Sequence, residues 1–487
     1  MPGPNVLFLF TDEQRADTLA ACGNPRIHTP NLDRLAGQST LFERAYVTQP
    51  VCTPSRSTIM TGLYPHTTGC TANNVPLPAG TPCLPELLPP GDYVTGYHGK
   101  WHLGDEVFRQ HAFDEWVSIE DMYVPHYSPG RDRSARSDYH RFLLAAGVHP
   151  PPRGIFGRAE TARMPERLSK PAFLAREACR FIRANARRPW ILYVNFLEPH
   201  MPFFGPRDGQ YDPSDVTLPG NFDAPPAEDQ PLKARLMARY YAERGHSGLP
   251  LRTEADWRRM IANYWGLCSL VDTHVGTILE AVADCGLWDE TVVVYTSDHG
   301  DMMGSHRMIA KCTMFEEAVR VPLLVKLPGQ GRGRGVVGPV SQIDLLPTLL
   351  DLLGAPAPPE LQGASLRPAL EGRAGGREEV FVEWNGDDSG LPLDDGGDYP
   401  DDLAAIAPAA AARAAVGDPV RSVVTADGWK LNASAAGENE LYDLHADPLE
   451  TANLFRRPES ARVLRRLTDR IRRWQERTAD TIELPGT

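Results

Sequence analysis

The residue pattern that most strongly suggests a chemical function contains a cysteine near the start of the chain. Cys52 opens the segment Cys52-Thr53-Pro54-Ser55-Arg56, and residues 57–61 favour a short helix. A helix N-terminus and a nearby guanidinium both lower the pKa of a thiol, so a reactive cysteine is one interpretation. A buried, inert cysteine is the other, because that is the commoner fate of a free cysteine. The local sequence alone does not separate them.

Polar clusters follow four apolar runs that predict buried strands. The runs are residues 6–10, 93–97, 191–196 and 292–296. They are followed, in order, by Asp12-Glu13, by Lys100 and His102, by His200, and by Asp298-His299. Ligands of open α/β sheets bind outside the carboxyl ends of the strands. We therefore expect these side chains to form one site at one edge of a sheet.

The first and last of these clusters have the donors of a metal site. Asp12, Glu13 and Asp298 offer carboxylate oxygens, and His299 adds a ring nitrogen. This set suits Ca²⁺, Mg²⁺ or Mn²⁺ better than a structural zinc ion. A single aspartate at a strand end is more often a helix cap or turn residue. Two acidic clusters at equivalent strand ends favour a divalent metal.

The elements that position these residues indicate an α/β fold. A fifth apolar run covers residues 323–325, and helical patterns cover 31–38, 171–186, 256–285 and 345–353. Strands that alternate with helices predict a mostly parallel central sheet with helices on both faces. We expect segments 105–167 and 205–253 to wall the pocket, and Asn73 or Asn74 to serve a turn rather than line it.

The C-terminal part of the chain has a different pattern. Residues 354–376, rich in Pro, Ala and Gly, read as a connector, and short strands are predicted at 379–384, 422–426 and 429–433 before a helix at 459–477. We therefore divide the chain into a catalytic domain, 1–370, and a smaller α+β subdomain, 371–487, with a short antiparallel sheet and a terminal helix. The aspartate-rich segment 386–402 is expected to be an exposed loop, with recognition of a cationic substrate as the alternative.

Composition limits the partners of this 487-residue chain. Its formal net charge of −13 argues against a nucleic-acid binder. No run reaches the roughly 18 apolar residues of a membrane span, and residues 1–14 lack a signal-peptide pattern, so we expect no membrane partner and a cytoplasmic protein. The eight scattered cysteines predict reduced thiols and suggest no zinc cluster. The oligomeric state is left open.

Together these residues resemble the formylglycine-dependent sulfatases of the alkaline-phosphatase superfamily. The segment CTPSRSTIMTG, from Cys52 to Gly62, contains the Cys-x-Pro-x-Arg signature of that family, and the strand-end clusters occur in the family's order. The resemblance implies an alkaline-phosphatase-like fold, hydrolysis of a small-molecule or sugar sulfate ester to alcohol and inorganic sulfate, and maturation by a formylglycine-generating enzyme that oxidises Cys52.

The resemblance also implies a role for each site residue. Hydrated formylglycine 52 would present two hydroxyls, one of which binds the metal beside Asp12, Glu13, Asp298 and His299 and attacks sulfur. Arg56 would stabilise the diol, and Lys100 and Lys311 would hold sulfate oxygens. His200, with Lys311, would protonate the leaving alcohol, and His102 would take the proton of the second hydroxyl.

Two departures from the family pattern keep alternatives open. Glu13 stands where an aspartate is common, and His299 where an asparagine is common, so Mn²⁺ or Mg²⁺ competes with the expected Ca²⁺. An Asp-His pair also resembles the phosphonate monoester hydrolases, which makes phosphonate-ester or phosphodiester hydrolysis the alternative activity. Lys100 and His102 match the sulfatases better. A metal-binding protein without catalysis is disfavoured, because it would not need all six catalytic candidates.

Overall fold

An eight-stranded sheet forms the centre of the molecule. The computed structural model describes residues 3–386, 391, 393 and 399–485. The strands lie in the order β10-β2-β9-β7-β1-β6-β4-β5. Their bounds are β1 Asn5–Asp12, β2 Thr40–Phe42, β4 Val94–Gly99, β5 Glu115–Val117, β6 Trp190–Pro199, β7 Thr291–Ser297, β9 Leu323–Lys326 and β10 Arg334–Val336. The four predicted strands that precede the polar clusters are therefore β1, β4, β6 and β7.

Strand direction brings the predicted clusters to one edge. β7, β1, β6 and β4 are neighbours, and each adjacent pair is parallel. Their apolar side chains are buried on both faces, as expected for a covered parallel sheet. β9 runs antiparallel to both β7 and β2, so the run at 323–325 is a strand of opposite direction within the mostly parallel sheet.

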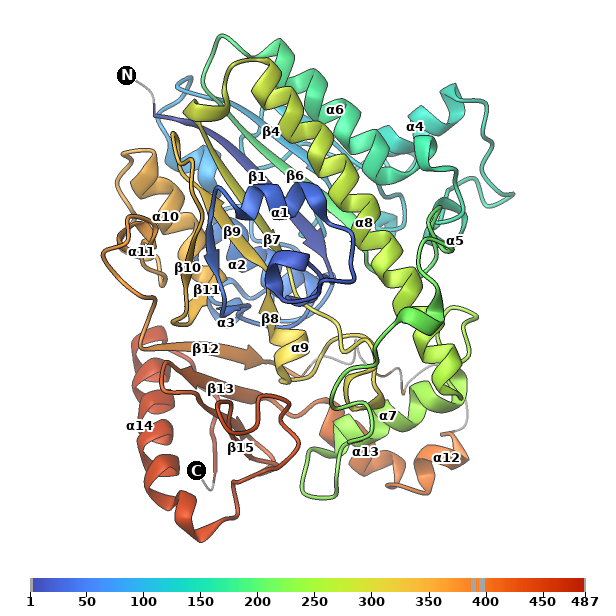
Figure 1. The fold of residues 1–487 in the computed structure, drawn as a ribbon, viewed down its shortest axis with the longest axis vertical. Coiled ribbons are helices and arrows are strands. Elements are labelled where there is room, and N and C mark those ends of the chain that lie inside the picture. Colours follow the sequence, from blue (N-terminus) through green and yellow to red (C-terminus); the bar gives the residue numbers. More distant parts are fainter. Residues whose placement is uncertain (1–2, 387–390, 392, 394–398, 486–487) are drawn as a thin grey trace.

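Helices cover the sheet, as the alternation of patterns predicts (Figure 1). α6 and α8 pack against each other and against β6, and α1 packs on α8. The longer helices are α1 Pro30–Ala36, α2 Cys52–Thr61, α4 Asp138–Ala145, α6 Lys170–Ala184, α7 Leu232–Arg244, α8 Glu254–Asp284, α10 Leu345–Leu352 and α13 Ala409–Val416. α4 and α7 lie in the segments 105–167 and 205–253 that we expected to wall the pocket. No helix in the described part of the chain is long and apolar enough to cross a membrane.

The C-terminal part forms the predicted antiparallel sheet. Its strands are β12 Glu379–Trp384, β13 Val420–Thr425, β14 Trp429–Ser434 and β15 Glu440–Asp443, in that order. The terminal helix α14, Ala461–Thr478, packs Leu467, Ile471 and Trp474 onto one face of this sheet (Figure 1). The other face contributes Val380 and Val382 to the core of the main sheet. The predicted loop at 386–402 lies largely outside the described residues.

Gly99, the last residue of β4, packs against β6 so closely that a side chain has no room. Its φ is +122°, and an added Cβ would lie 1.9 Å from the carbonyl oxygen of Asn195. This approach directs the chain toward Lys100 at the edge of the sheet.

We expect Gly99→Ala to lower the free energy of unfolding by roughly 2–5 kcal/mol, because left-handed backbone strain adds to overpacking. Gly23→Ala is the matched control, since Gly23 has a φ of +101° and open space around it. The control should cost only the strain, about 1–2 kcal/mol. Denaturant unfolding of both variants measures the difference, and equal losses would contradict the packing argument.

Candidate active site

All the predicted catalytic and metal-binding residues lie together beyond the carboxyl ends of β1, β4, β6 and β7. Asp12 ends β1, Lys100 and His102 follow β4, His200 follows β6, and Asp298 and His299 follow β7. Cys52 and Arg56 come from α2, and Lys311 from the loop after β7. The cluster is buried, and its most exposed residues are His200, Lys311 and His102, at 8%, 7% and 6% of the whole residue.

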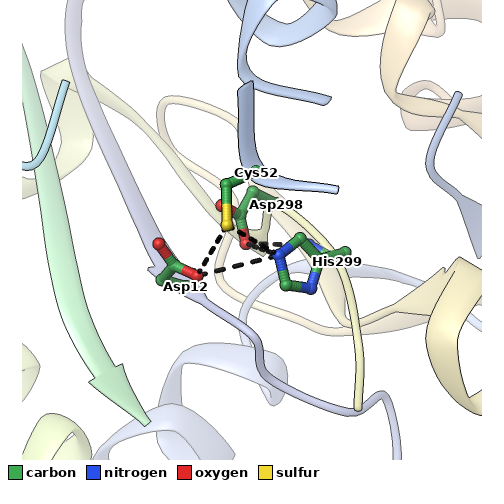
Figure 2. Close-up of side chains that lie close together, drawn as sticks. All are labelled: Asp12, Cys52, Asp298 and His299. Carbon is green, nitrogen blue, oxygen red and sulfur yellow. Dashed lines mark hydrogen bonds and ion pairs between the residues drawn. The ribbon is translucent and has the colours of Figure 1, made fainter. Parts of the chain in front are cut away.

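Cys52 is the first residue of α2 and lies at the centre of this cluster. Its Sγ is 3.2 Å from His299 Nε2 and 3.6 Å from Asp12 Oδ1 (Figure 2). Burial, reinforced by the negative charge of Asp12, raises the pKa of the thiol to about 11. Of the two interpretations that the local sequence left open, the burial of Cys52 and this raised pKa favour a cysteine whose thiol is not activated. The unmodified side chain is a protonated thiol and a poor nucleophile at neutral pH.

Arg56 faces the carboxylates instead of the thiol. Its Nη2 donates to Asp12 Oδ2 and its Nε to Asp298 Oδ2, both at 2.8 Å. Its Nη1 donates to the carbonyl of Lys100 at 2.8 Å and to Asn195 Oδ1 at 2.7 Å. The guanidinium thus ties the ends of β1, β7, β4 and β6 together, and stabilisation of a diol by Arg56 stays a prediction.

The acceptor atoms around Cys52 fit a divalent cation. Ligand atoms of Asp12, Cys52, Asp298 and His299 all lie within 4.8 Å of one another. His299 Nδ1 is 2.9 Å from the carbonyl oxygen of Gly300, which can only accept, so Nδ1 carries the proton. The lone pair of Nε2 therefore faces Asp12 Oδ1 at 3.7 Å and Asp298 Oδ1 at 3.6 Å (Figure 2). Three acceptors that converge in a buried place favour a positive charge between them.

Glu13 points away from that group. Its Oε2 is 3.0 Å from Lys311 Nζ and 3.3 Å from His200 Nε2, and it forms a second cluster of ligand atoms with Asp12 and His200. Burial raises the pKa of Glu13 to about 8 despite the charge of Lys311. Its Oε1 has no hydrogen-bond partner among the described residues. Glu13 as a metal ligand therefore stays a prediction.

His200 and Lys311 form a donor–acceptor pair beside the cluster. His200 Nδ1 donates to the carbonyl of Met201 at 2.7 Å, which leaves Nε2 to accept from Lys311 Nζ at 3.0 Å. Burial, together with the charge of Lys311, holds the pKa of His200 well below its usual value. The imidazole is neutral, and the proton nearest to the site is on Lys311.

His102 has one ring nitrogen without a hydrogen-bond partner among the described residues. Its Nε2 is 3.0 Å from Asn74 Oδ1, and its buried Nδ1 has no partner among the described residues. Burial, then the charges of Lys100 and Arg56, hold the pKa of His102 well below its usual value, so the imidazole is neutral and Nδ1 has an unprotonated lone pair. Lys100 Nζ is 2.5 Å from Asp12 Oδ2. Asn74 lies in a turn with a φ of +65°, as expected, and also orients a site residue.

The segment 105–167 lines the active site with residues that the sequence did not single out. Arg158, in the short helix α5 Arg158–Thr161, forms ion-paired hydrogen bonds to Glu120 at 2.7 and 2.9 Å. Its Nη1 is 3.4 Å from His200 Nδ1, and its Nη2 donates to Tyr123 OH at 2.9 Å. The ring of Tyr123 packs on His102 with centroids 4.5 Å apart. This segment therefore does wall the site, through residues that contact both histidines.

Comparison with known proteins agrees with the site. A family model described as Sulfatase matches residues 4–355. The chain is 28% identical to the multifunctional alkaline phosphatase superfamily protein PehA of Trinickia caryophylli, over 99% of the chain and 96% of that protein. It is 29% identical to a choline-sulfatase of Rhizobium meliloti, over 93% of the chain and 83% of that protein.

A solved structure shares the fold. The phosphonate monoester hydrolase SpPMH from Silicibacter pomeroyi superimposes with a TM-score of 0.78 at 25% identity, covering 99% of this chain and 97% of that one. The match of the family model extends from β1 through the strand-end clusters to α10, and so includes every catalytic candidate. The chain therefore belongs to the sulfatase family and is a hydrolase of sulfate esters.

Proposed function

We propose that Cys52 is the precursor of formylglycine, and that the hydrated residue, with a divalent cation, cleaves the sulfate ester of a small alcohol or a sugar. One observation carries the proposal. The Cys52 side chain points at the meeting place of Asp12, Asp298 and His299, yet the thiol has a pKa near 11. A residue so well placed and so poorly nucleophilic fits a precursor better than a catalytic thiol.

Maturation needs a partner enzyme. Cys52 is 2% exposed and is covered by the strand-end residues. A formylglycine-generating enzyme would therefore have to reach it before the chain folds around α2. The fraction of Cys52 that is converted to formylglycine would therefore depend on how each protein sample is made.

Asp12, Asp298 and His299, with an oxygen of the modified residue 52, would hold the cation. When bound, a divalent cation neutralises sulfate oxygens and lowers the pKa of a hydroxyl beside it. Ca²⁺ and Mg²⁺ suit the carboxylates, whereas the nitrogen of His299 favours Mn²⁺ more than an amide oxygen would. For Glu13 to join these ligands, its Oε2 would have to leave Lys311 and its carboxyl would have to lose its proton.

The lysines around residue 52 would bind sulfate. The histidines and Lys311 would each take part in a different proton transfer. Lys100 and Lys311 would bind sulfate oxygens as point charges. Lys311, directly or through His200 Nε2, would supply the proton of the leaving alcohol, since that nitrogen accepts from Lys311. His102 Nδ1 would accept the proton of the second hydroxyl and so restore the aldehyde, a role that suits a neutral imidazole without another partner.

Phosphonate-ester or phosphodiester hydrolysis is the second candidate. The observation that favours it is His299 after Asp298, together with the similarity to SpPMH. Lys100 and His102 favour sulfate, because both lie within the cluster and match the sulfatase pattern. The two kinds of substrate are similar in shape and charge.

The first prediction concerns Cys52 itself. Trypsin releases residues 45–56 after Arg44 and Arg56, and mass spectrometry of this peptide should show formylglycine in active preparations. Cys52→Ala should lower kcat on an aryl sulfate by about 10⁴-fold or more, because the nucleophile is lost. Cys70→Ser is the control, a buried cysteine outside the site, and should keep the wild-type rate. Full activity of Cys52→Ala, or an active sample with only unmodified Cys52, would refute the mechanism.

The second prediction separates the two histidines. His102→Asn should release about one equivalent of alcohol and then stop, because the site is not restored until the second hydroxyl loses its proton. His200→Asn should show no such burst. Its rate should fall by about 10²–10⁴-fold on an alkyl sulfate and less on an aryl sulfate, whose leaving group needs less protonation. Stopped-flow product release distinguishes the variants, and the same pattern for both would contradict the division of roles.

The third prediction ranks the candidate substrates. After chelation and reloading with Ca²⁺, Mg²⁺ or Mn²⁺, kcat/KM should be higher for an aryl sulfate than for an aryl phosphodiester with each metal. His299→Asn should shift the preference toward Ca²⁺, since an amide oxygen is a harder ligand than imidazole. A higher value for the phosphodiester throughout would replace the sulfate assignment by the second candidate.

A further inference from the structure

Three side chains that can bind a metal, those of Cys83, Glu86 and His111, lie close together outside the active site. The scattered cysteines of the sequence had suggested no zinc cluster. Cys83 precedes the short helix η2, Leu84–Leu87, which contains Glu86, and His111 lies in the loop between β4 and β5. One donor atom from each lies within 4.8 Å of the other two. His111 Nδ1 is 3.1 Å from Glu86 Oε2. The separation of His111 from the other two along the chain hides this cluster from motif searches.

The donors match one class of ion. A thiolate sulfur, an imidazole nitrogen and a carboxylate oxygen are the three kinds of ligand that Zn²⁺ takes in proteins. We propose that Cys83, Glu86 and His111 bind a Zn²⁺ ion with water as the fourth ligand. Binding replaces the thiol proton of Cys83 by a sulfur–metal bond, and that proton leaves to solvent. No oxidation or reduction is needed.

Burial gives the cluster a closed side and an open side. Cys83 is 0% exposed. The side chain of His111 is 5% exposed and that of Glu86 29% exposed. Glu86 lines a surface cleft of about 510 Å³, together with Leu88, Tyr93 and neighbouring residues. The cluster therefore adjoins this cleft through Glu86, the most exposed of its three side chains.

Hydrogen bonds and backbone conformation hold the ligands in place. The backbone N–H of Cys83 donates to Glu86 Oε2 at 2.8 Å, which fixes the carboxylate beside the sulfur. His111 and Ala112 have φ values of +50° and +56°, so two successive residues with side chains lie in the left-handed region. This conformation costs about 1–2 kcal/mol per residue. Such strain is typical of sites where the chain is held for a ligand.

The ion would anchor the loop that carries two sulfate-site residues. The ring of His111 packs on Trp101, with centroids 5.6 Å apart. Trp101 lies between Lys100 and His102, and its backbone N–H donates to Glu106 Oε1 at 2.9 Å. A metal bond between His111 and η2 would therefore restrain this loop from the side opposite the active site.

Cobalt spectroscopy tests the proposal without interference from the active site. Cys52→Ser removes the active-site thiol, and saturating Ca²⁺ occupies its carboxylates. Titration with Co²⁺ should then give one equivalent of a thiolate-to-cobalt charge-transfer band. The band should vanish in Cys52→Ser/Cys83→Ser and persist in the matched control Cys52→Ser/Cys70→Ser. Absence of the band in Cys52→Ser, or its survival without Cys83, would overturn the proposal.

Two further variants guard against misfolding of the Cys83 variant. His111→Asn keeps a residue that tolerates a positive φ, and Glu86→Gln keeps an acceptor for the N–H of Cys83. Each substitution should weaken the Zn²⁺ affinity, measured by competition with a chelating dye. Loss of a hydrogen bond to a metal ligand costs about 10–100-fold in affinity, and loss of a ligand should cost more. Circular dichroism confirms folding. Unchanged Zn²⁺ affinity in both folded variants would show that Glu86 and His111 are not ligands.

Discussion

The buried guanidinium of Arg56 is the interaction on which the rest of the structure depends. It contacts Asp12 and Asp298, which end neighbouring strands, and the carbonyl of Lys100 and Asn195 on the strands beyond. An uncompensated buried charge is strongly destabilising, so the carboxylates and the cation stabilise the fold only together. The contact that joins the strand ends occupies Oδ2 of both carboxylates, and both aspartates belong to the group of ligand atoms around Cys52. Folding therefore also assembles the candidate metal site.

Most of the central sheet could be predicted because parallel strands are apolar on both faces. The runs that became β1, β6 and β7 needed extension by only one to three residues at either end, and the polar residues after them fell at one edge. The direction of β9 could not be predicted, because three apolar residues do not show which way a strand runs. α7 was missed because its segment, 232–244, mixes charged and apolar residues without a clear stripe. The boundary between residues 370 and 371 stays a prediction, and Val380 and Val382 join the main core across it.

The candidate site was predictable where its residues adjoin strands and not where loops fold back. Asn74 and Arg158 reach the histidines from segments whose paths no local pattern specifies. The same reason hid Cys83, Glu86 and His111. The state of the Cys52 thiol could not be decided from the sequence for a different reason. A helix N-terminus is visible in the sequence, whereas the burial and the carboxylate that outweigh it belong to the tertiary structure.

The charges of the buried cluster bear on the choice between the two candidate substrates. Asp12 and Asp298 pair with Arg56 and Lys100. Glu13 adds little negative charge beside Lys311 at neutral pH, since burial raises its pKa to about 8, so the cluster has a surplus of positive charge. The histidines add no charge, since burial keeps His102 and His200 neutral through lowered pKa values. A bound divalent cation would add to this surplus of positive charge, which attracts an anion. Sulfate monoesters and phosphonate monoesters each carry one negative charge, so this surplus does not separate them. Discrimination must come from the placement of Lys100 and His102 around the oxygens.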